Sequence, residues 1–207
     1  MTLIKFCGMT NIDDSLEAVA LDVNALGFIF APSPRRIDVS AARDIVLRLP
    51  SSIWKVGVFV NEELSKVRGI AEDCGLDAVQ LHGQEPPEYC RQIPLWVVKA
   101  IGVRGAGSLK EMERYSCASI LLDTPGTDRA GGTGKTFSWE IALEARKKRN
   151  FILSGGLNPV NVYGAVLKVR PIGVDVCSGV EKSPGKKDRS KMIEFIREVK
   201  RADESIQ

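Results

Sequence analysis

A single cysteine stands near the start of the chain, where a short apolar run meets a glycine turn. The segment reads Leu3-Ile4-Lys5-Phe6-Cys7-Gly8-Met9-Thr10. Strand ends that lead into glycine loops are where α/β enzymes expose catalytic groups, so Cys7 is a candidate for chemistry. A free cysteine is more often a small buried hydrophobe, and position alone leaves both interpretations open.

Asp123 is the second candidate, because it ends the apolar run Ser119-Ile120-Leu121-Leu122. If the fold places them on opposite sides of one site, a thiol and a carboxylic acid could transfer protons as base and acid. That chemistry requires Cys7 to be a thiolate and Asp123 to keep its proton near neutral pH. The chain has one histidine, His82, so a histidine-rich metal set and a Cys-His nucleophilic pair are both poorly supported. We expect no metal, and a polar rim position for His82.

Two glycine-rich segments lie late in the chain. They read Ser154-Gly155-Gly156-Leu157-Asn158-Pro159 and Cys177-Ser178-Gly179-Val180-Glu181, the second following a strand that contains Asp175. Glycine lets backbone N–H groups converge on an anion, and helix N-termini add a favourable dipole. We therefore predict a phosphate site here, while the alternative is that these glycines only make tight turns.

The segment Gly131-Gly132-Thr133-Gly134-Lys135-Thr136 resembles a nucleotide-binding P-loop but fails on spacing. That motif requires a glycine five positions before Gly134, where Arg129 stands. The segment fits a lid with Lys135 near an anionic substrate, or a merely flexible exposed loop.

These candidates follow strands in a repeated pattern of apolar run, turn and amphipathic helix. The runs are continuously apolar, as parallel strands covered on both faces are. The predicted strands are Leu3 to Cys7, Ala25 to Phe30, Lys55 to Val60, Ala78 to Leu81, Trp96 to Ala100, Ser119 to Asp123, Phe151 to Ser154 and Gly173 to Val176. Eight such units predict an α/β fold, a single small (β/α)8 TIM barrel. The alternative is an open doubly wound sheet, which lacks support because no G-x-G-x-x-G follows the first strand.

Helical patterns fill the intervals between the strands. The predicted helices are Asn11 to Leu21, Ser40 to Leu49, Ser65 to Cys74, Ser138 to Lys148, Pro159 to Arg170 and Asp188 to Ala202. Asn11 or Asp13 can cap the first of them. The helix after the fourth strand looks short, and the one after the fifth strand is shortened to Ser108 to Tyr115.

Composition limits the class of protein. The chain has 207 residues, a net charge of +3 and five cysteines. We expect one catalytic domain over 1–207, in the cytoplasm, with neither a disulfide framework nor a membrane span. The charge balance does not indicate nucleic-acid binding. The basic run Lys186-Lys187-Asp188-Arg189 either adds positive potential to the anion site or is a solvated surface.

The motifs in combination resemble the phosphoribosylanthranilate isomerase family. The matching segments are Lys5 to Thr10, Val56 to Asn61, Val79 to Gly83, Leu121 to Thr124, Gly131 to Phe137, Ser154 to Leu157 and Val174 to Glu181. The resemblance implies a (β/α)8 barrel and a cofactor-free Amadori rearrangement in tryptophan biosynthesis. It also implies a phosphorylated small-molecule substrate and a monomer or homodimer.

The resemblance implies a role for each candidate residue. Asp123 matches the general acid and Cys7 the general base. Arg35, in Ser33-Pro34-Arg35, is expected to hold the anthranilate carboxylate, although Arg36 directly follows it and could take that place. Phosphate binding is implied for the turn residues, and supporting substrate contacts for two others on the rim. These are Gly155, Gly156, Ser178 and Gly179, with Asp175 and His82.

Three rival functions are consistent with the same residues. Another sugar-phosphate isomerase or epimerase would use the same phosphate loops without an anthranilate pocket. A non-catalytic phosphate-ligand sensor would bind without turnover. A thiol redox protein would couple Cys7 to a resolving cysteine, and no cysteine close in sequence favours this.

Overall fold

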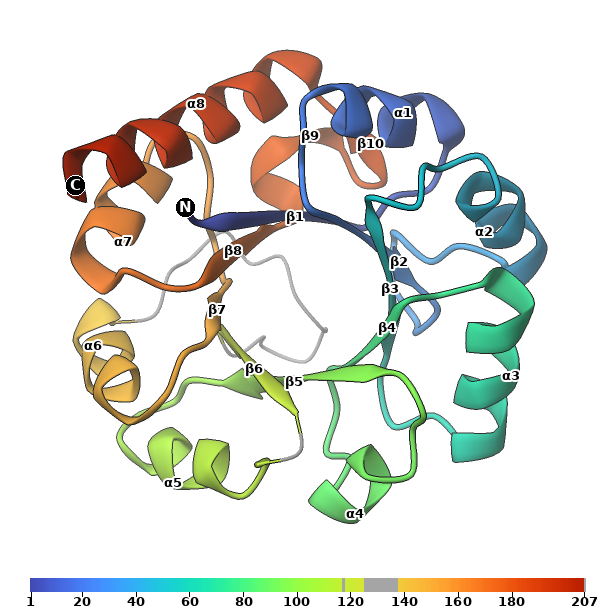
Figure 1. Cartoon of the computed structure of the whole chain (residues 1–207), viewed down its shortest axis with the longest axis horizontal. Helices are drawn as coiled ribbons and strands as arrows, with labels where there is room; N and C mark the ends of the chain where they lie inside the picture. The colour runs from blue at the N-terminus through green and yellow to red at the C-terminus, as the bar shows by residue number, and fades with distance from the viewer. Residues whose placement is uncertain (117, 125–137, 207) are drawn as a thin grey trace.

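Eight parallel strands close into one barrel, with helices on the outside (Figure 1). The computed structural model describes residues 1–116, 118–124 and 138–206. The strands are β1 (Leu3–Cys7), β2 (Ala25–Ile29), β3 (Trp54–Phe59), β4 (Ala78–Leu81), β5 (Trp96–Gly102), β6 (Ser119–Asp123), β7 (Ile152–Leu153) and β8 (Gly173–Val176). Because β1 pairs with β8, the predicted barrel is confirmed and the open sheet is wrong.

The observed strands begin and end within two residues of the bounds that the apolar runs predict. Predicted and observed bounds agree for β1, β4, β6 and β8. Strand β7 is shorter than expected: only Ile152 and Leu153 pair, because the chain turns at Ser154 into the glycines that follow. Ser154, Gly155 and Gly156 of this seventh loop lie at the mouth of the barrel.

Helices α1 to α8 follow their strands in order. They are α1 (Ile12–Ala20), α2 (Val39–Val46), α3 (Leu64–Cys74), α4 (Pro87–Cys90), α5 (Gly107–Glu113), α6 (Trp139–Lys148), α7 (Val162–Val169) and α8 (Arg189–Ile206). Asn11 is the residue that caps α1, its side chain accepting from the Asp14 N–H at 2.9 Å. Helix α5 is shortened as predicted, but α4 is shorter still, with four residues.

Helix α7 begins three residues later than predicted, at Val162 instead of Pro159. The side chains of Asn158 and Asn161 both donate to the Gly156 carbonyl, at 3.3 and 2.9 Å, and hold residues 156–161 in a turn. The seventh loop is therefore longer and internally braced, and it does not run directly into a helix at the proline.

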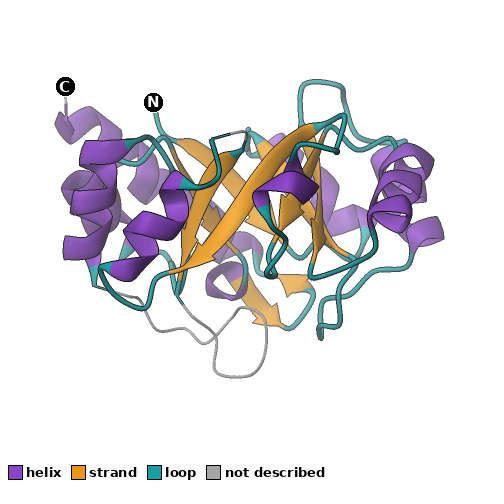
Figure 2. Ribbon diagram, turned by 90° about the horizontal axis from the view of Figure 1, so that it is seen from below, coloured by secondary structure: helices purple, strands orange, loops and turns teal. Residues whose placement is uncertain are grey.

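A short antiparallel hairpin that the sequence did not predict lies between β8 and α8. A 3-10 turn (η1, Ser178–Val180) leads into β9 (Glu181–Ser183), which pairs with β10 (Lys186–Lys187). Figure 2 places this hairpin at one end of the barrel and both chain termini at the other. The termini are joined by Thr2, whose N–H and hydroxyl both donate to Asp203, each at 2.6 Å.

The layer between the strands and the surrounding helices contains a buried ion pair as well as apolar side chains. Lys99 of β5, 1% exposed, donates to the Gly83 carbonyl at 2.6 Å and to Glu85 at 2.9 Å. Glu85 in turn accepts from the backbone N–H groups of Asn61 and Gly83. A buried polar network that is satisfied in this way rigidifies the chain around it, so the loop after β4 is held at a fixed place on the rim.

Candidate active site

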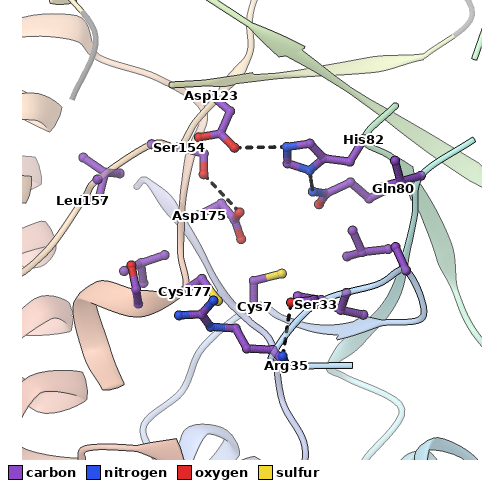
Figure 3. A pocket seen from close by; sticks show the side chains of 18 of the residues that line it. Cys7, Ser33, Arg35, Gln80, His82, Asp123, Ser154, Leu157, Asp175 and Cys177 are labelled. Carbon is purple, nitrogen blue, oxygen red and sulfur yellow. Dashed lines mark hydrogen bonds and ion pairs between the residues drawn. The ribbon is translucent and has the colours of Figure 1, made fainter. Parts of the chain in front are cut away.

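A pocket opens at the carboxyl ends of the strands. This end of a (β/α)8 barrel is where small-molecule sites form. Figure 3 shows side chains from both sides of the barrel converging on it. The polar residues that line it are Cys7, Ser33, Arg35, Gln80, His82, Asp123, Ser154, Asp175, Cys177 and Ser178.

Cys7 lies at the end of β1 with its sulfur over a glycine of the next strand. Register pairs Cys7 with Gly27, and a Cβ added at Gly27 would stand 2.7 Å from the Cys7 sulfur. The neighbouring Cys177 side chain and the ammonium of Lys5 lower the pKa of Cys7 to about 6, against the opposing effect of burial. The fold therefore favours a thiolate at the place where the sequence predicts a base.

Lys5 and Asp175 form a buried ion pair directly below Cys7. The Lys5 ammonium contacts the Asp175 carboxylate at 2.7 Å, and both side chains are under a tenth exposed. Burial lowers the pKa of Lys5, but the negative charges of Asp175 and Cys7 raise it more. The second oxygen of Asp175 accepts from the Ser154 hydroxyl at 3.2 Å. Asp175 therefore lines the pocket, with both carboxylate oxygens in contact with neighbouring side chains.

Asp123, His82 and Gln80 form a hydrogen-bonded row across the barrel from Cys7 (Figure 3). His82 Nε2 is 3.0 Å from Asp123 Oδ2, and the other oxygen, Oδ1, accepts from the Thr124 N–H at 2.7 Å. Burial lowers the pKa of His82, but the hydrogen bond and charge of Asp123 raise it above its usual value. His82 is thus the direct partner of the candidate acid.

The Gln80 amide fits two protonation states of His82. Its Nε2 lies 3.0 Å from His82 Nδ1, and its buried Oε1 has no partner among the described residues. Exchanging the two amide atoms by rotation would let Oε1 accept a proton from Nδ1–H of an imidazolium. The row can therefore match either neutral or protonated histidine.

The predicted anion-binding turns meet at the pocket edge. Gly155 and Gly156 line the pocket and both have positive φ, +85° and +67°. Within the described part of the chain, their amide N–H groups donate to no acceptor. Ser178 also lines the pocket, whereas Gly179 lies behind it, and a Cβ at Gly179 would collide with the Leu157 carbonyl. Gly179 thus lets the two loops pack together.

Arg35, not Arg36, faces the pocket. Its guanidinium holds Glu181 in a bidentate pair, with Nε 2.9 Å from Oε1 and Nη2 2.8 Å from Oε2. Arg36 is exposed and joins the end of β2 through a backbone bridge to Ile29. Because a guanidinium has five N–H donors and Glu181 engages only those on Nε and Nη2, Arg35 has further donors for a ligand.

Within the basic run Lys186 to Arg189, Lys187 is not a solvated surface residue. The Lys187 ammonium is buried and donates to the carbonyl oxygens of Cys7, at 2.6 Å, and Cys177, at 3.2 Å. It also contacts Glu181 at 3.2 Å. Neither sequence interpretation of this run included this role, in which Lys187 ties the ends of β1 and β8 together.

Sequence reasoning missed Lys5, Cys177, Glu181 and Lys187 as members of the site. Cys177 could have been found from the predicted barrel only with the register of its first and last strands. That register pairs Leu3 with Gly173 and Phe6 with Val176, so the next residues along, Cys7 and Cys177, are neighbours. Neither strand alone reveals this, since the pairing of the first and last strands exists only in a closed barrel. The segment Gly131 to Thr136 lies outside the described residues.

Among residues 1–116, 118–124 and 138–206, no three His, Cys, Asp or Glu side chains are grouped so that they could hold a metal ion. In those residues no helix combines the length and apolar character needed to span a bilayer.

One pocket combines a thiol of lowered pKa, a carboxyl group with a histidine partner and two glycine-rich turns. Such a set suits an isomerase of a phosphorylated substrate. The family model for N-(5'phosphoribosyl)anthranilate (PRA) isomerase matches residues 4–198. The chain belongs to this family.

Two solved phosphoribosylanthranilate isomerase structures and one curated relative show how far the likeness extends. The enzyme from Thermotoga maritima superposes with a TM-score of 0.92 at 46% identity, covering 97% of this chain and 99% of that one. A complex of phosphoribosylanthranilate isomerase with reduced 1-(o-carboxyphenylamino)-1-deoxyribulose 5-phosphate gives 0.88 at 44% identity, covering 97% and 99%. The isomerase of Desulforudis audaxviator is 48% identical over 98% of this chain and all of its own length.

Proposed function

We propose that this protein catalyses the Amadori rearrangement of N-(5-phosphoribosyl)anthranilate to 1-(2-carboxyphenylamino)-1-deoxyribulose 5-phosphate, a step of tryptophan biosynthesis, with Asp123 as general acid and Cys7 as general base. Membership of the isomerase family supports the reaction. The residue roles rest on one observation: a thiolate-stabilising site and a carboxyl–histidine pair face each other across the same pocket. The scheme needs proton transfers only, so it uses no cofactor.

The phosphate is proposed to bind at the seventh and eighth loops. The N–H groups of Gly155 and Gly156 have no acceptor within the described chain, and Ser178 adds a hydroxyl from the facing turn. Glycine at these positions keeps the backbone open to an anion. An anchored phosphate fixes the sugar between the two catalytic arcs of the rim.

Ring opening is assigned to Asp123. Its carboxyl proton goes to the furanose ring oxygen, the C1′–O bond breaks, and the anilino nitrogen supplies the electron pair that forms an iminium. Asp123 is left as a carboxylate. His82, 3.0 Å away and with a raised pKa, can then return a proton to it.

Proton abstraction is assigned to Cys7. Its thiolate takes the C2′ proton, and the electrons of that C–H bond form the double bond of an enolamine while the iminium nitrogen becomes neutral. Tautomerisation moves a proton to C1′ and releases the hydroxyl proton at C2′, which gives the ketone. Substrate and product thus have the same atoms.

Arg35 is proposed to bind the anthranilate carboxylate. It lines the pocket next to Cys177, and its planar fork suits a carboxylate. Glu181 fixes the orientation of the guanidinium through its bidentate contact, so the free N–H donors are already aligned before substrate enters. Asp175 and His82 are proposed to support the site through Lys5 and Asp123.

The test is the turnover of purified Cys7→Ala and Asp123→Asn variants on phosphoribosylanthranilate, followed by its fluorescence. Each variant is expected to lower kcat by about 10²- to 10⁴-fold, because each removes one proton-transfer group. Affinity for a non-reacting phosphate analogue should stay within a fewfold of the parent, since the loops are untouched. Cys7→Ser serves as a matched control that keeps the shape but has a far weaker base.

Near-normal turnover in either Ala or Asn variant would overturn the acid–base assignment. Turnover of other sugar phosphates, with none of phosphoribosylanthranilate, would indicate a different isomerase on the same phosphate loops. Binding without any turnover by the parent would indicate a sensor.

The setting of the enzyme completes the proposal. We place this activity in the cytoplasm, in one catalytic domain over 1–207 that acts without nucleic acid, as a monomer or homodimer. Sedimentation of the purified chain distinguishes the two assembly states.

A further inference from the structure

A buried lysine that the acid–base scheme does not use lies behind His82. Lys99 of β5 is 1% exposed and is not part of the pocket lining. Strand register pairs it with Leu81, whose side chain packs in the layer between strands and helices, so Lys99 faces the same layer. Its carboxylate partner, Glu85, is as deeply buried. Taking both charges out of water carries a desolvation cost that apolar side chains avoid, so a buried ion pair is weak evidence of a purely stabilising role.

The Lys99 ammonium holds the main chain on both sides of His82. It donates to the carbonyl oxygens of Leu81, at 3.3 Å, and Gly83, at 2.6 Å. It also donates to Glu85 at 2.9 Å. An ammonium has three N–H donors, so two carbonyls and one carboxylate account for all of them. The residues before and after His82 are thus fixed to one buried atom outside the pocket.

Glu85 fixes the same loop through its backbone N–H groups. Its two carboxylate oxygens accept from the N–H of Asn61, at 2.7 Å, and the N–H of Gly83, at 3.0 Å. The Glu85 carbonyl accepts from the Tyr115 hydroxyl at 2.9 Å. Gly83 is therefore held through both its N–H and its carbonyl. A buried network satisfied in this way makes the chain directly after His82 rigid.

The His82 ring depends on a fixed backbone because its two nitrogen atoms have different partners. Nε2 lies 3.0 Å from Asp123 Oδ2, and Nδ1 lies 3.0 Å from Gln80 Nε2. Figure 3 shows the imidazole between these two side chains. Hydrogen bonds weaken steeply as their angle departs from linear. A small rotation of the chain at residue 82 would therefore weaken the contact with Asp123.

We propose that Lys99 is a positioning residue for His82: by holding the carbonyls of Leu81 and Gly83, it keeps the imidazole in line with Asp123. This rests on the proposed function, because it takes Asp123 as the general acid and His82 as the group that returns its proton. Lys99 itself exchanges no proton with substrate.

The test removes the ammonium in Lys99→Met and in the double variant Lys99→Met/Glu85→Gln. The double variant leaves no unpaired charge in the buried layer, so it carries the test if the single variant does not fold. Lys55→Met is the matched control. It also removes a buried strand ammonium that has a carboxylate partner, but that partner, Asp77, precedes β4 and lies away from the pocket lining. Circular dichroism confirms which variants are folded.

The titration of His82, followed by NMR, is a readout that a merely structural role would not move. Burial lowers the pKa of His82, but Asp123, with smaller effects of Cys7 and Asp175, raises it above its usual value. Loss of the Lys99 charge would by itself raise this pKa further, since a nearby cation disfavours imidazolium. Loss of alignment with Asp123 acts in the opposite direction, and we expect a downward shift of about half a unit or more.

Turnover of phosphoribosylanthranilate is the second readout. We expect kcat to fall about ten- to hundredfold in both Lys99 variants, because proton transfer depends on alignment. KM should stay near the parent value, since the phosphate loops and Arg35 are untouched. The control Lys55→Met should keep both the parent kcat and the parent His82 titration.

Three results would refute the role of Lys99. The first is an unshifted or raised His82 pKa in a folded Lys99 variant. The second is a parent kcat in a variant whose His82 pKa has fallen. The third is an equal loss of kcat in Lys55→Met, which would mean that loss of any buried ammonium slows the enzyme. If His82 shifts as expected but the parent does not turn over phosphoribosylanthranilate, the positioning holds and the proposed function fails.

Discussion

The two sides of the barrel mouth use opposite electrostatics for the same kind of step. The cysteine arc, formed by Lys5 and Cys7 of β1, Asp175 of β8 and Cys177 directly after it, places cations near the Cys7 sulfur. The aspartate arc, formed by Gln80 of β4, His82 directly after it and Asp123 of β6, joins its carboxyl group to one imidazole. The first arc stabilises a group without its proton, and the second keeps a proton within reach of a carboxylate.

The difference shows that position on the rim does not assign a role. Cys7 and Asp123 both end a strand and both line the pocket. The proposed base and the proposed acid differ in the side chains that other segments bring beside them. Asp175 of β8 pairs with the lysine two residues before Cys7, whereas His82, directly after β4, pairs with Asp123.

Removing the cation of the cysteine arc should have the largest effect. Lys5→Met leaves the Asp175 carboxylate buried without its partner, at an expected loss of about 3–5 kcal/mol in the free energy of unfolding, and it should raise the pKa of Cys7. Lys55→Met is the matched control, because its partner Asp77 is 40% exposed and can be solvated. Urea denaturation of both variants measures the difference. Equal losses would mean that burial of the carboxylate does not decide the cost.

Crowding the reactive sulfur should reduce activity while the barrel remains folded. The added methyl of Gly27→Ala would stand 2.7 Å from the Cys7 sulfur and must displace it. A displacement of this kind is expected to lower kcat about ten- to hundredfold, because proton abstraction depends on alignment. Gly69→Ala in α3 is the control: nothing lies within 4 Å, so it should keep full activity and gain about 0.5–1 kcal/mol of stability. Steady-state kinetics with unchanged circular dichroism would check this, and normal kcat in Gly27→Ala would show that the sulfur can move freely.

On the aspartate arc, the titration of His82 should report its pairing. As the chain has one histidine, its NMR signal is unambiguous. We expect a pKa above the usual ~6.5 in the parent and a downward shift of about one unit or more in Asp123→Asn, since burial is then opposed only by the smaller effects of Cys7 and Asp175. A titration that Asp123→Asn leaves unchanged would separate the two residues.

The direction of the His82 shift also fixes its effect on stability. Because the folded pKa is raised, the pair stabilises the fold fully below ~6.5 and loses this contribution as pH rises through the folded pKa.

Local sequence predicted the strands well because each apolar run depends on its own residues. The residues Leu3 to Cys7 and Ser119 to Asp123 are strands in the structure with the same bounds. The β9–β10 hairpin was not predicted, since Glu181 and Lys187 are polar and pair only because the hairpin folds back over Thr10 and Asp14. The start of α7 was misplaced for a similar reason, because the side chains of Asn158 and Asn161 hold residues 156–161 in a turn.

The sequence by itself determined the alternation of strands and helices, and with it that Cys7, Asp123 and the glycine loops share one rim. Tertiary structure alone decided their partners: Cys177 beside Cys7, His82 beside Asp123, and Glu181 beside Arg35. The physical reason is range. Periodicity and turn chemistry act over a few residues, whereas an ion pair or a contact between two thiols depends on strands that meet only when the barrel closes.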